Sequence, residues 1–367
     1  MEALHNRIDY YKNAEFLLCM LNHMTDLVRV TDGKHNLLLE NEAMRQWRGD
    51  RECMHCFEAI GRDEPCEECI SQSAIRLNRI FSKEICMDGR VYAVDSIPIP
   101  CTSSGPASAM EVIRDITEYK RLYAELQSKN MRMQKKLEMA HAMQKSLIPR
   151  DTRYGEYAFS TFFRSCETLG GDMMDIVELP HNELAFYIAD ISGHGVPAGM
   201  LTMMLHQMVR IHSKELAYGH TLGLFMEAMQ RSFNDMALEA DKYITMALGV
   251  LEPRTGLVTL LNAGHNMLPV HISHSGEITE IELHGMPISK WHQGETYDEH
   301  TIKLERGDSL LLYTDGLARG GREEYPGIKK ILSGVPREDI LKALKREAEC
   351  QPNDDDTAAL LLQRDEQ

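Results

Sequence analysis

The chain has 367 residues, of which 43% are hydrophobic and 26% charged, values that exclude disordered and fibrous proteins and leave room for two domains. Its formal net charge of -16 argues against a nucleic-acid-binding surface, which needs a basic face. The first twenty residues lack the basic start and apolar core of a secretory signal, and no apolar run approaches the roughly 18 residues of a membrane span, so we expect a cytoplasmic protein with no membrane contact. Nine cysteines in such a chain favour reduced thiols or metal ligands over a disulfide framework.

The N-terminal region is predicted to be a small α+β domain at residues 16–117, after a lead segment at 1–15. Residues 84–97 and 108–113 alternate between apolar and polar, as half-buried strands do. Between them the Ser-, Gly- and Pro-containing segment 101–106 predicts the loop of a hairpin.

A long helix is predicted at 118–149, because no glycine or proline occurs before Pro149 and most residues are strong helix formers. Apolar or small residues recur there every seven positions: Tyr119, Leu126, Met133, Ala140 and Leu147. Leu122 and Met143 lie on the companion seam, which Lys129 and Lys136 interrupt. The pattern fits either a solvated connector helix or a marginal two-stranded coiled coil, and we favour the coiled coil, which would make the protein a homodimer.

The C-terminal region, residues 150–367, is predicted to contain sheets covered by helices. The nearly continuous apolar runs at 184–189 and 309–314 are typical of strands buried on both faces. Residues 197–212 and 221–238 are predicted to be helices.

Four acidic clusters lie in this region, each at an expected strand end or tight turn: residues 170–175, 189–195, 313–316 and 353–357. A single Asp-Gly pair is usually just a turn. Several carboxylates that converge at the ends of buried strands, however, repel one another and are costly unless a cation neutralises them. Ligands that are all oxygen select Mg²⁺, Mn²⁺ or Ca²⁺ over zinc. The sequence therefore predicts a site for a hard divalent cation.

Five segments carry a resemblance to a known family: GGDMMD at 170–175, ADISGHGVPAGM at 189–200, NAGHNMLP at 262–269, LYTDGL at 312–317 and DDDTAALLL at 354–362. In this order they resemble the motifs of PPM-type metal-dependent Ser/Thr phosphatases, in the bacterial SpoIIE/RsbU branch. The resemblance implies an αββα sandwich of two antiparallel sheets with helices outside. It also implies a binuclear Mn²⁺/Mg²⁺ centre that hydrolyses phosphoserine or phosphothreonine.

Carried over motif by motif, the resemblance implies acidic metal ligands and one backbone ligand. Asp172 and Asp190 would bind metal, with Asp190 as the bridge, and the carbonyl of Ile191 would contribute beside it. Asp315 would complete the second metal. In the last motif the spacing to the threonine selects Asp354, with Asp355 beside it, although the triple aspartate leaves an ambiguity of one residue.

Two histidines in these motifs, His194 and His265, are candidates for a general acid or a phosphate ligand, but we expect them to shape turns and to hydrogen-bond the neighbouring motif. The sequence departs from the family pattern in two places. Arg319 stands where the family commonly has glutamate, and GMPISKW at 285–291 replaces the usual G-x-P-L-G.

The N-terminal domain resembles PAS sensory domains, most specifically in the DITE segment at 115–118 that leads into the helix. It contains two C-x-x-C pairs, formed by Cys53, Cys56, Cys66 and Cys69. Such pairs could hold zinc or an iron–sulfur cluster, with Cys86 or Cys101 as extra ligands. Alternatively the cysteines are small apolar residues or a reducible pair.

The sequence thus predicts an α+β protein with a PAS-like domain, a coiled-coil linker helix and a PPM-type phosphatase domain. The branch implies a phosphorylated STAS-domain (anti-anti-sigma) protein as substrate. Two alternatives stay open: a catalytically idle module that sequesters a partner, and a phosphatase that acts on a small phosphorylated molecule.

Overall fold

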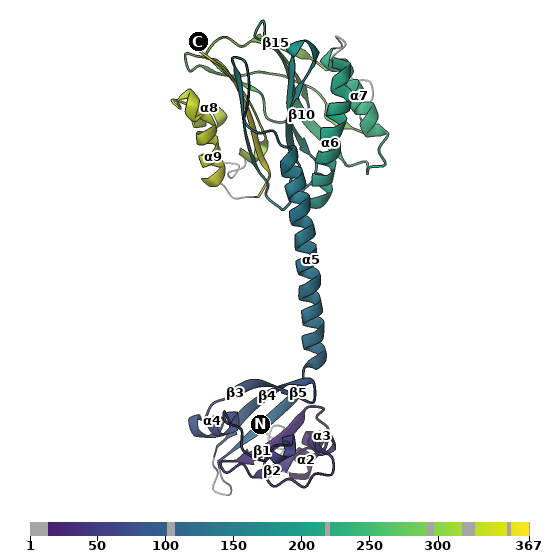
Figure 1. Cartoon of the computed structure of the whole chain (residues 1–367), viewed down its shortest axis with the longest axis vertical. Helices are drawn as coiled ribbons and strands as arrows, with labels where there is room; N and C mark the ends of the chain where they lie inside the picture. Colours follow the sequence, from purple (N-terminus) through teal and green to yellow (C-terminus); the bar gives the residue numbers. More distant parts are fainter. Residues whose placement is uncertain are drawn as a thin grey trace, which may run out of the picture. The chain divides into compact units, whose positions relative to one another are not determined.

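The computed structural model describes residues 14–100, 107–216, 221–291, 297–317, 327–350 and 354–366. The chain divides into two compact units, with the boundary inside helix α5 (Thr117–Leu147), between Arg132 and Met133 (Figure 1). Each unit is described by itself below.

The N-terminal unit is built on a five-stranded antiparallel sheet with the strand order β2-β1-β5-β4-β3. Helices α3 and α4 pack against this sheet. The elements are α2 (Ala14–Asn22), β1 (Leu27–Asp32), β2 (Leu37–Glu40), α3 (Glu42–Arg48), α4 (Ile70–Leu77), β3 (Phe81–Met87), β4 (Arg90–Ile99) and β5 (Ser108–Asp115). A small core centres on Met44, Ala59, Tyr92, Val94 and Ile113.

The predicted strand at 84–97 is in fact a hairpin, because the chain reverses at Asp88 and Gly89, which both have positive φ. An Asp-Gly pair favours such a turn. The hairpin predicted around 101–106 is confirmed by the pairing of β4 with β5, in which Ile99 lies opposite Ser108. Its loop at 101–106, which includes Cys101, lies outside the described residues.

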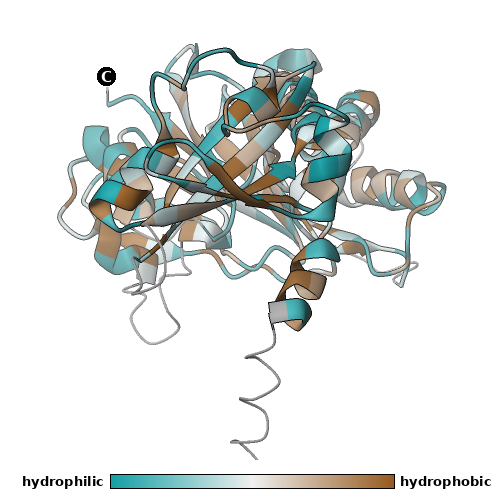
Figure 2. Ribbon diagram, turned by 90° about the horizontal axis from the view of Figure 1, so that it is seen from below, coloured by the Kyte–Doolittle hydropathy of each residue, from teal (hydrophilic) through white to brown (hydrophobic). Residues whose placement is uncertain are grey.

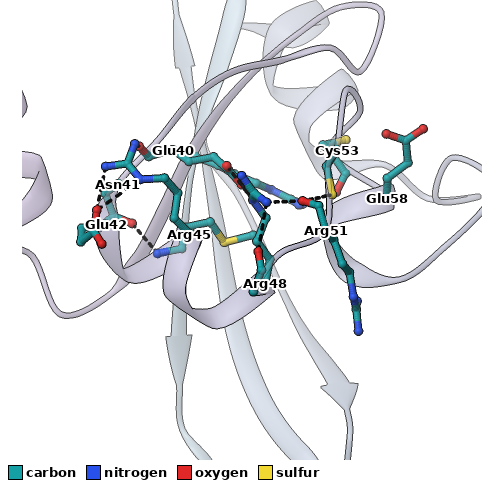
Figure 3. A network of polar contacts seen from close by, with 12 residues as sticks. Glu40, Asn41, Glu42, Arg45, Arg48, Arg51, Cys53 and Glu58 are labelled. Atoms are coloured by element: carbon teal, nitrogen blue, oxygen red, sulfur yellow. Dashed lines mark hydrogen bonds and ion pairs between the residues drawn. The ribbon is translucent and has the colours of Figure 1, made fainter.

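Asn41 explains how three elements of this unit meet. Its buried side-chain oxygen accepts hydrogen bonds from the backbone N–H groups of Val28 (3.0 Å) and Met44 (2.9 Å), and so caps α3 (Figure 3). Its amide donates to the carbonyls of Leu21 and Asp26. All hydrogen-bonding groups of a fully buried amide are thereby satisfied, which an apolar residue could not do.

Helix α5 confirms the predicted linker helix. Thr117 starts the helix, where its hydroxyl and its N–H both bond to the carboxylate of Asp115. Three residues of the predicted stripe, whose members recur every seven positions, are exposed: Tyr119, Leu126 and Met133. Whether a second chain covers this stripe stays a prediction.

The C-terminal unit contains two six-stranded sheets. The first has the order β15-β11-β10-β9-β8, with β14 paired to β10, and the second has the order β13-β12-β16-β17-β7-β6. The strands are β6 (Thr152–Tyr154), β7 (Tyr157–Arg164), β8 (Asp172–Glu178), β9 (Leu184–Ile191), β10 (Tyr243–Glu252), β11 (Leu257–Ala263), β12 (Val270–Ile272), β13 (Ile278–Glu280), β14 (Ile288–Ser289), β15 (Glu299–Lys303), β16 (Ser309–Tyr313) and β17 (Thr357–Arg364). Strands β9 and β16 confirm the two strands predicted from apolar runs.

Helices cover the outer faces of both sheets. Figure 1 shows α6 (Gly195–Leu216) beside α7 (Leu222–Asn234), and α8 (Gly327–Leu332) beside α9 (Ile340–Cys350). The first pair packs on the first sheet and the second pair on the second sheet. Brown and teal residues alternate along the helices in Figure 2, as expected when one side of a helix meets a sheet and the other meets water.

A third apolar core lies between the two sheets and includes Phe159, Phe186, Ile188, Leu312 and Leu360. Together with the two helix-covered cores it gives four layers, helix–sheet–sheet–helix. This arrangement confirms the predicted αββα sandwich. Among the described residues, no helix combines the length and the apolar character needed to cross a bilayer.

Candidate metal centre

Asp172 and Asp190 face each other at one edge of the space between the sheets. They are direct cross-strand partners in the antiparallel pair of β8 and β9. Side chains two residues apart on a strand point to the same face. Met174, two residues from Asp172, and Ile188, two residues from Asp190, belong to the core between the sheets. Both carboxylates therefore point inward, at the strand ends where that core stops.

Three glycines of the motifs allow the surrounding loops to close on this edge. A Cβ atom on Gly170 would lie 2.9 Å from the carboxyl carbon of Asp356, and one on Gly316 would lie 1.8 Å from the backbone oxygen of Asp356. A Cβ on Gly171 would lie 2.9 Å from the carbonyl oxygen of Ile191. These glycines thus allow backbone and carboxylate to approach where any side chain would collide.

Other carboxylates act on the carboxyl of Asp172 at this edge. Burial raises the pKa of Asp172 well above its usual range, and Asp190, Asp356 and Asp355 raise it further. The hydroxyl of Thr314 donates a 2.7 Å hydrogen bond to Asp172, which favours its charged form but does not neutralise it. Buried, mutually repelling oxygen ligands are the donor set of a hard divalent cation, so the residues present fit the predicted metal.

The last motif contributes a residue that the sequence analysis missed. Asp356 is buried, and its carboxylate accepts hydrogen bonds from the backbone N–H groups of Cys166 (2.8 Å) and Gly171. Ligand atoms of Cys166, Asp355 and Asp356 lie within 4.8 Å of one another, whereas Asp354 is exposed. The alternation of β17, in which Ala358 and Leu360 point inward, could have identified Asp356 as an inward residue.

Asp315 follows β16 and begins a short 3-10 turn, Asp315–Leu317. Beside it, His265 is buried between strands, with one ring nitrogen 3.1 Å from the hydroxyl of Thr245 and the other 2.9 Å from the carbonyl of Tyr313. Burial lowers the pKa of His265, which favours the neutral form of its ring. These contacts agree with the expected turn-shaping role, since they bind the NAGH turn to the strand that carries Asp315.

The other histidine, His194, is exposed and lies 2.6 Å from a carboxylate oxygen of Glu167. This contact joins the loop after β9 to the loop before β8. Glu167 lies three residues before GGDMMD, so the contact reaches the segment that leads into the neighbouring motif and not the motif itself.

Asp175, the second acid of GGDMMD, lies on the opposite face of β8 from Asp172. It contacts α6, where the guanidinium of Arg210 is 2.9 Å and the ring of His206 is 3.2 Å from its carboxylate. The protein itself therefore balances this charge, and Asp175 does not belong to the metal centre.

Gln144 connects the linker helix to the same loops. It is the one buried residue of α5, all of which the structure describes. Its side chain donates to the carbonyl of Gly170 (2.7 Å) and to the hydroxyl of Thr202 (2.8 Å), and accepts from the N–H of Gly170 (3.1 Å). The end of α5 thus holds the loop that leads directly into Asp172.

The four predicted cysteine ligands of the N-terminal unit do not behave as one group. Cys56, Cys66 and Cys69 line a single cavity, whereas Cys53 does not. The sulfur of Cys53 lies 3.6 Å from the carbonyl of Arg51, in the polar network beside α3 (Figure 3). Zinc or an iron–sulfur cluster there stays a prediction. Arg319 lies outside the described residues.

Comparison with known proteins identifies the family. A model described as Stage II sporulation protein E (SpoIIE) matches residues 180–365, just over half of the chain. The chain belongs to the SpoIIE family. Asp190, Asp315 and Asp354 fall within the matched residues of this SpoIIE member, and Asp172 lies just before them.

Individual relatives of this SpoIIE member are distant. The phosphoserine phosphatase RsbP of Bacillus subtilis (strain 168) is 22% identical over 240 residues, 62% of this chain and 57% of RsbP. The chain therefore spans less than two thirds of the length of this curated relative.

One solved structure, at a TM-score above 0.5, agrees with the fold. The SiaA-PP2C domain of Pseudomonas aeruginosa matches 65% of this chain and 99% of its own, at 18% identity and a TM-score of 0.55. The PP2C phosphatase domain of Bacillus subtilis SpoIIE, with a fragment of its regulatory domain, matches 78% of this chain and 82% of its own, at 14% identity and a TM-score of 0.49. The C-terminal unit has the PP2C phosphatase fold.

Proposed function

We propose that this protein is a signalling phosphatase that hydrolyses phosphoserine or phosphothreonine on a partner protein. The observation that carries the proposal is the facing pair Asp172 and Asp190, in which the buried carboxyl of Asp172 lies among further carboxylates that raise its pKa. Membership of the SpoIIE family and the relative RsbP, which is named a phosphoserine phosphatase, support the same reaction.

The proposed cofactor is a pair of Mn²⁺ or Mg²⁺ ions. Asp172, Asp190, Asp315 and the carbonyl of Ile191 would hold them, with Asp354 or Asp355 from the last motif. Two such ions, when bound, make water a nucleophile at neutral pH and neutralise charge on the phosphoryl group.

The chain's own groups prepare the site for this cofactor. Thr314 orients one carboxylate oxygen of Asp172 through its hydrogen bond. Asp356 fixes the backbone of Gly171 and Cys166, and His265 holds the strand that precedes Asp315. No protein nucleophile is needed in this scheme.

We further propose that a PAS-like sensor regulates the phosphatase. The strand order β2-β1-β5-β4-β3 and the helix that leaves β5 support a PAS-like domain. Gln144 offers the route, because it attaches the end of the linker helix to the loop before Asp172. The exposed stripe of Tyr119, Leu126 and Met133 supports a dimer formed through this helix.

The proposed substrate is a phosphorylated STAS-domain protein, as the SpoIIE/RsbU branch implies. The test is phosphate release from such a protein and from an aryl phosphate, with Mn²⁺ and with chelator. The full chain is compared with Asp315→Asn and with the control Asp298→Asn, which changes an exposed aspartate outside the site.

Phosphate release that requires Mn²⁺, is lost in Asp315→Asn and persists in Asp298→Asn supports the proposal. Turnover of the aryl phosphate and of small phosphorylated metabolites without turnover of the STAS protein would favour the small-molecule alternative. Binding of the STAS protein without any hydrolysis would favour the idle module and overturn the proposed activity.

A further inference from the structure

We propose that the cavity of the N-terminal unit is a zinc site whose ligands are His35, Cys56, Cys66 and Cys69. This set differs from the four cysteines that the sequence spacing suggests, because the fold replaces Cys53 with His35. The proposal is independent of the phosphatase activity.

The cavity has a volume of about 260 Å³, and all four proposed ligands line it. They come from separate parts of the chain. His35 lies between β1 and β2, and Cys56 lies in the segment after α3. The pair Cys66 and Cys69 comes just before α4. A metal ion here would join segments that otherwise pack around a small core.

Two of the ligands already stand at a chelating distance. The sulfur of Cys56 lies 3.8 Å from Nδ1 of His35. Zinc bond lengths of about 2.3 Å to sulfur and 2.0–2.1 Å to nitrogen, at a tetrahedral angle, place these two atoms about 3.6 Å apart. A small rotation of either side chain is therefore enough.

The second pair, Cys66 and Cys69, has the C-x-x-C spacing of a zinc chelate. Cys69 is the residue before α4, where it has an extended backbone and its side chain makes no capping hydrogen bond. Among the described residues no three of the four ligand atoms lie within 4.8 Å of one another. Binding therefore has to draw the turn with Cys66 and Cys69 toward Cys56.

Burial of Cys56 disfavours its thiolate form unless a cation compensates the charge. Burial raises the pKa of the Cys56 thiol to about 12, and the thiols of Cys69 and Cys66 add to the rise. Arg29, which favours the Cys56 thiolate, is already ion-paired with Glu111. Arg51, Arg62 and Lys83 also line the cavity, but none of them replaces the thiol proton by a bond to sulfur as a metal does. Zinc would replace the thiol protons and compensate the thiolates.

The ligand set also selects the metal. Three sulfurs and one imidazole form a common structural zinc site, whereas iron–sulfur clusters usually need four cysteines. Cys53 is the matched control, because its sulfur faces the carbonyl of Arg51 and it does not line the cavity. Cys86, on β3, is exposed but also lines the cavity, so it does not serve as a control.

The test is elemental analysis of the full chain, purified without chelator or metal-affinity resin, together with titration by Co²⁺. We expect about one zinc ion per chain and, with Co²⁺, the absorption of a tetrahedral site with thiolate ligands. His35→Ala, Cys66→Ser and Cys69→Ser should each weaken zinc binding by at least about 100-fold. Cys53→Ser should bind zinc as the parent does.

Because a lost ligand could also unfold the domain, free thiols are counted in the parent chain with and without a chelator. Chelation should expose three additional reactive thiols, and Cys53→Ser should leave that difference unchanged. The proposal is overturned if the chain binds no zinc, if it contains iron and inorganic sulfide instead, or if Cys53→Ser loses zinc as Cys66→Ser does.

Discussion

Asp172 and Asp175 belong to one motif and one strand, yet their surroundings are opposite. Asp172 points between the sheets, where its neighbours are other carboxylates and the hydroxyl of Thr314. Asp175 points toward α6, where Arg210 and His206 approach its carboxylate. Both are almost completely buried.

The difference shows how burial alone fails to identify a reactive acid. An acid that the protein pairs with its own cation is structural, and its removal leaves a charge without a partner. An acid that the protein buries among other acids requires a cation from outside. Because side chains alternate along β8, an odd separation of three residues is what places the two acids on different faces.

The largest effect is expected when the inward acid is changed. Asp172→Asn should lower Mn²⁺-dependent phosphatase activity by more than about 10³-fold, equivalent to about 4 kcal/mol. Without metal its melting temperature should not fall below that of the parent, because a buried repelling charge is removed. Mn²⁺ should raise the melting temperature of the parent but not of the variant. A metal-free variant that unfolds far more easily would contradict this account of Asp172.

The last motif allows a sharper comparison between adjacent acids. Asp355 acts on Asp172 and lies near Asp356, whereas Asp354 is exposed. We therefore expect Asp355→Asn to weaken Mn²⁺ activation by at least about 10-fold more than Asp354→Asn. Activity measured over a range of Mn²⁺ concentrations gives this ratio, and the reverse order would restore Asp354 as the ligand that the motif spacing selects.

The outward acid should give the opposite result. Asp175→Asn leaves Arg210 and His206 without their partner, so we expect the free energy of unfolding to fall by about 2 kcal/mol. The Mn²⁺ requirement of the folded fraction should stay unchanged. Urea unfolding of the metal-free chain measures the loss, and Asp298→Asn is the control. A variant with parental stability but altered Mn²⁺ affinity would refute the distinction between the two faces.

The sequence predicted those features that depend on the order of the motifs and on the pattern of apolar residues. Five motifs in order identified the sandwich, and the apolar runs at 184–189 and 309–314 located the strands that carry Asp190 and precede Asp315. The triple aspartate was different, because a shift of one residue moves a side chain to the other face. In the structure Asp356 is the buried acid of the three, and its carboxylate bonds to the backbone of Cys166 and Gly171.

Contacts between segments that are distant in the chain also could not be predicted from the sequence. Gln144 resembles any polar residue of an exposed helix, and nothing local predicts that its amide bonds to Gly170. The C-x-x-C spacing suggested Cys53 as a ligand, since spacing reports only local chain geometry. Which residue actually reaches the cavity depends on how β1 and β2 position His35, and that is a property of the folded domain.

Gln144 predicts how strongly the linker helix and the metal centre are joined. Gln144→Leu should lower the free energy of unfolding by about 1–3 kcal/mol, because the N–H and carbonyl of Gly170 lose a buried partner. It should also alter phosphatase activity, since that glycine precedes Asp172. Gln134→Leu, on an exposed position of the same helix, is the matched control. Equal effects of the two substitutions would show that the contact has no specific role.

The smallest effect concerns pH. Burial lowers the pKa of His265 in the folded state, while the unfolded chain keeps a value near 6.5. As the pH falls below about 6.5, the unfolded state takes up the proton first, so folding stability is lost until the folded pKa is reached. The contribution is at most about 1.4 kcal/mol per pH unit.

His265→Gln should remove this slope relative to the parent when metal-free unfolding is followed from pH 7.5 to about 5.5. Asp172, whose pKa is raised, acts in the opposite direction in both proteins and cancels from the difference. An unchanged slope would mean that His265 is charged in the folded protein, and its assignment as a neutral bridge between Thr245 and Tyr313 would then fail.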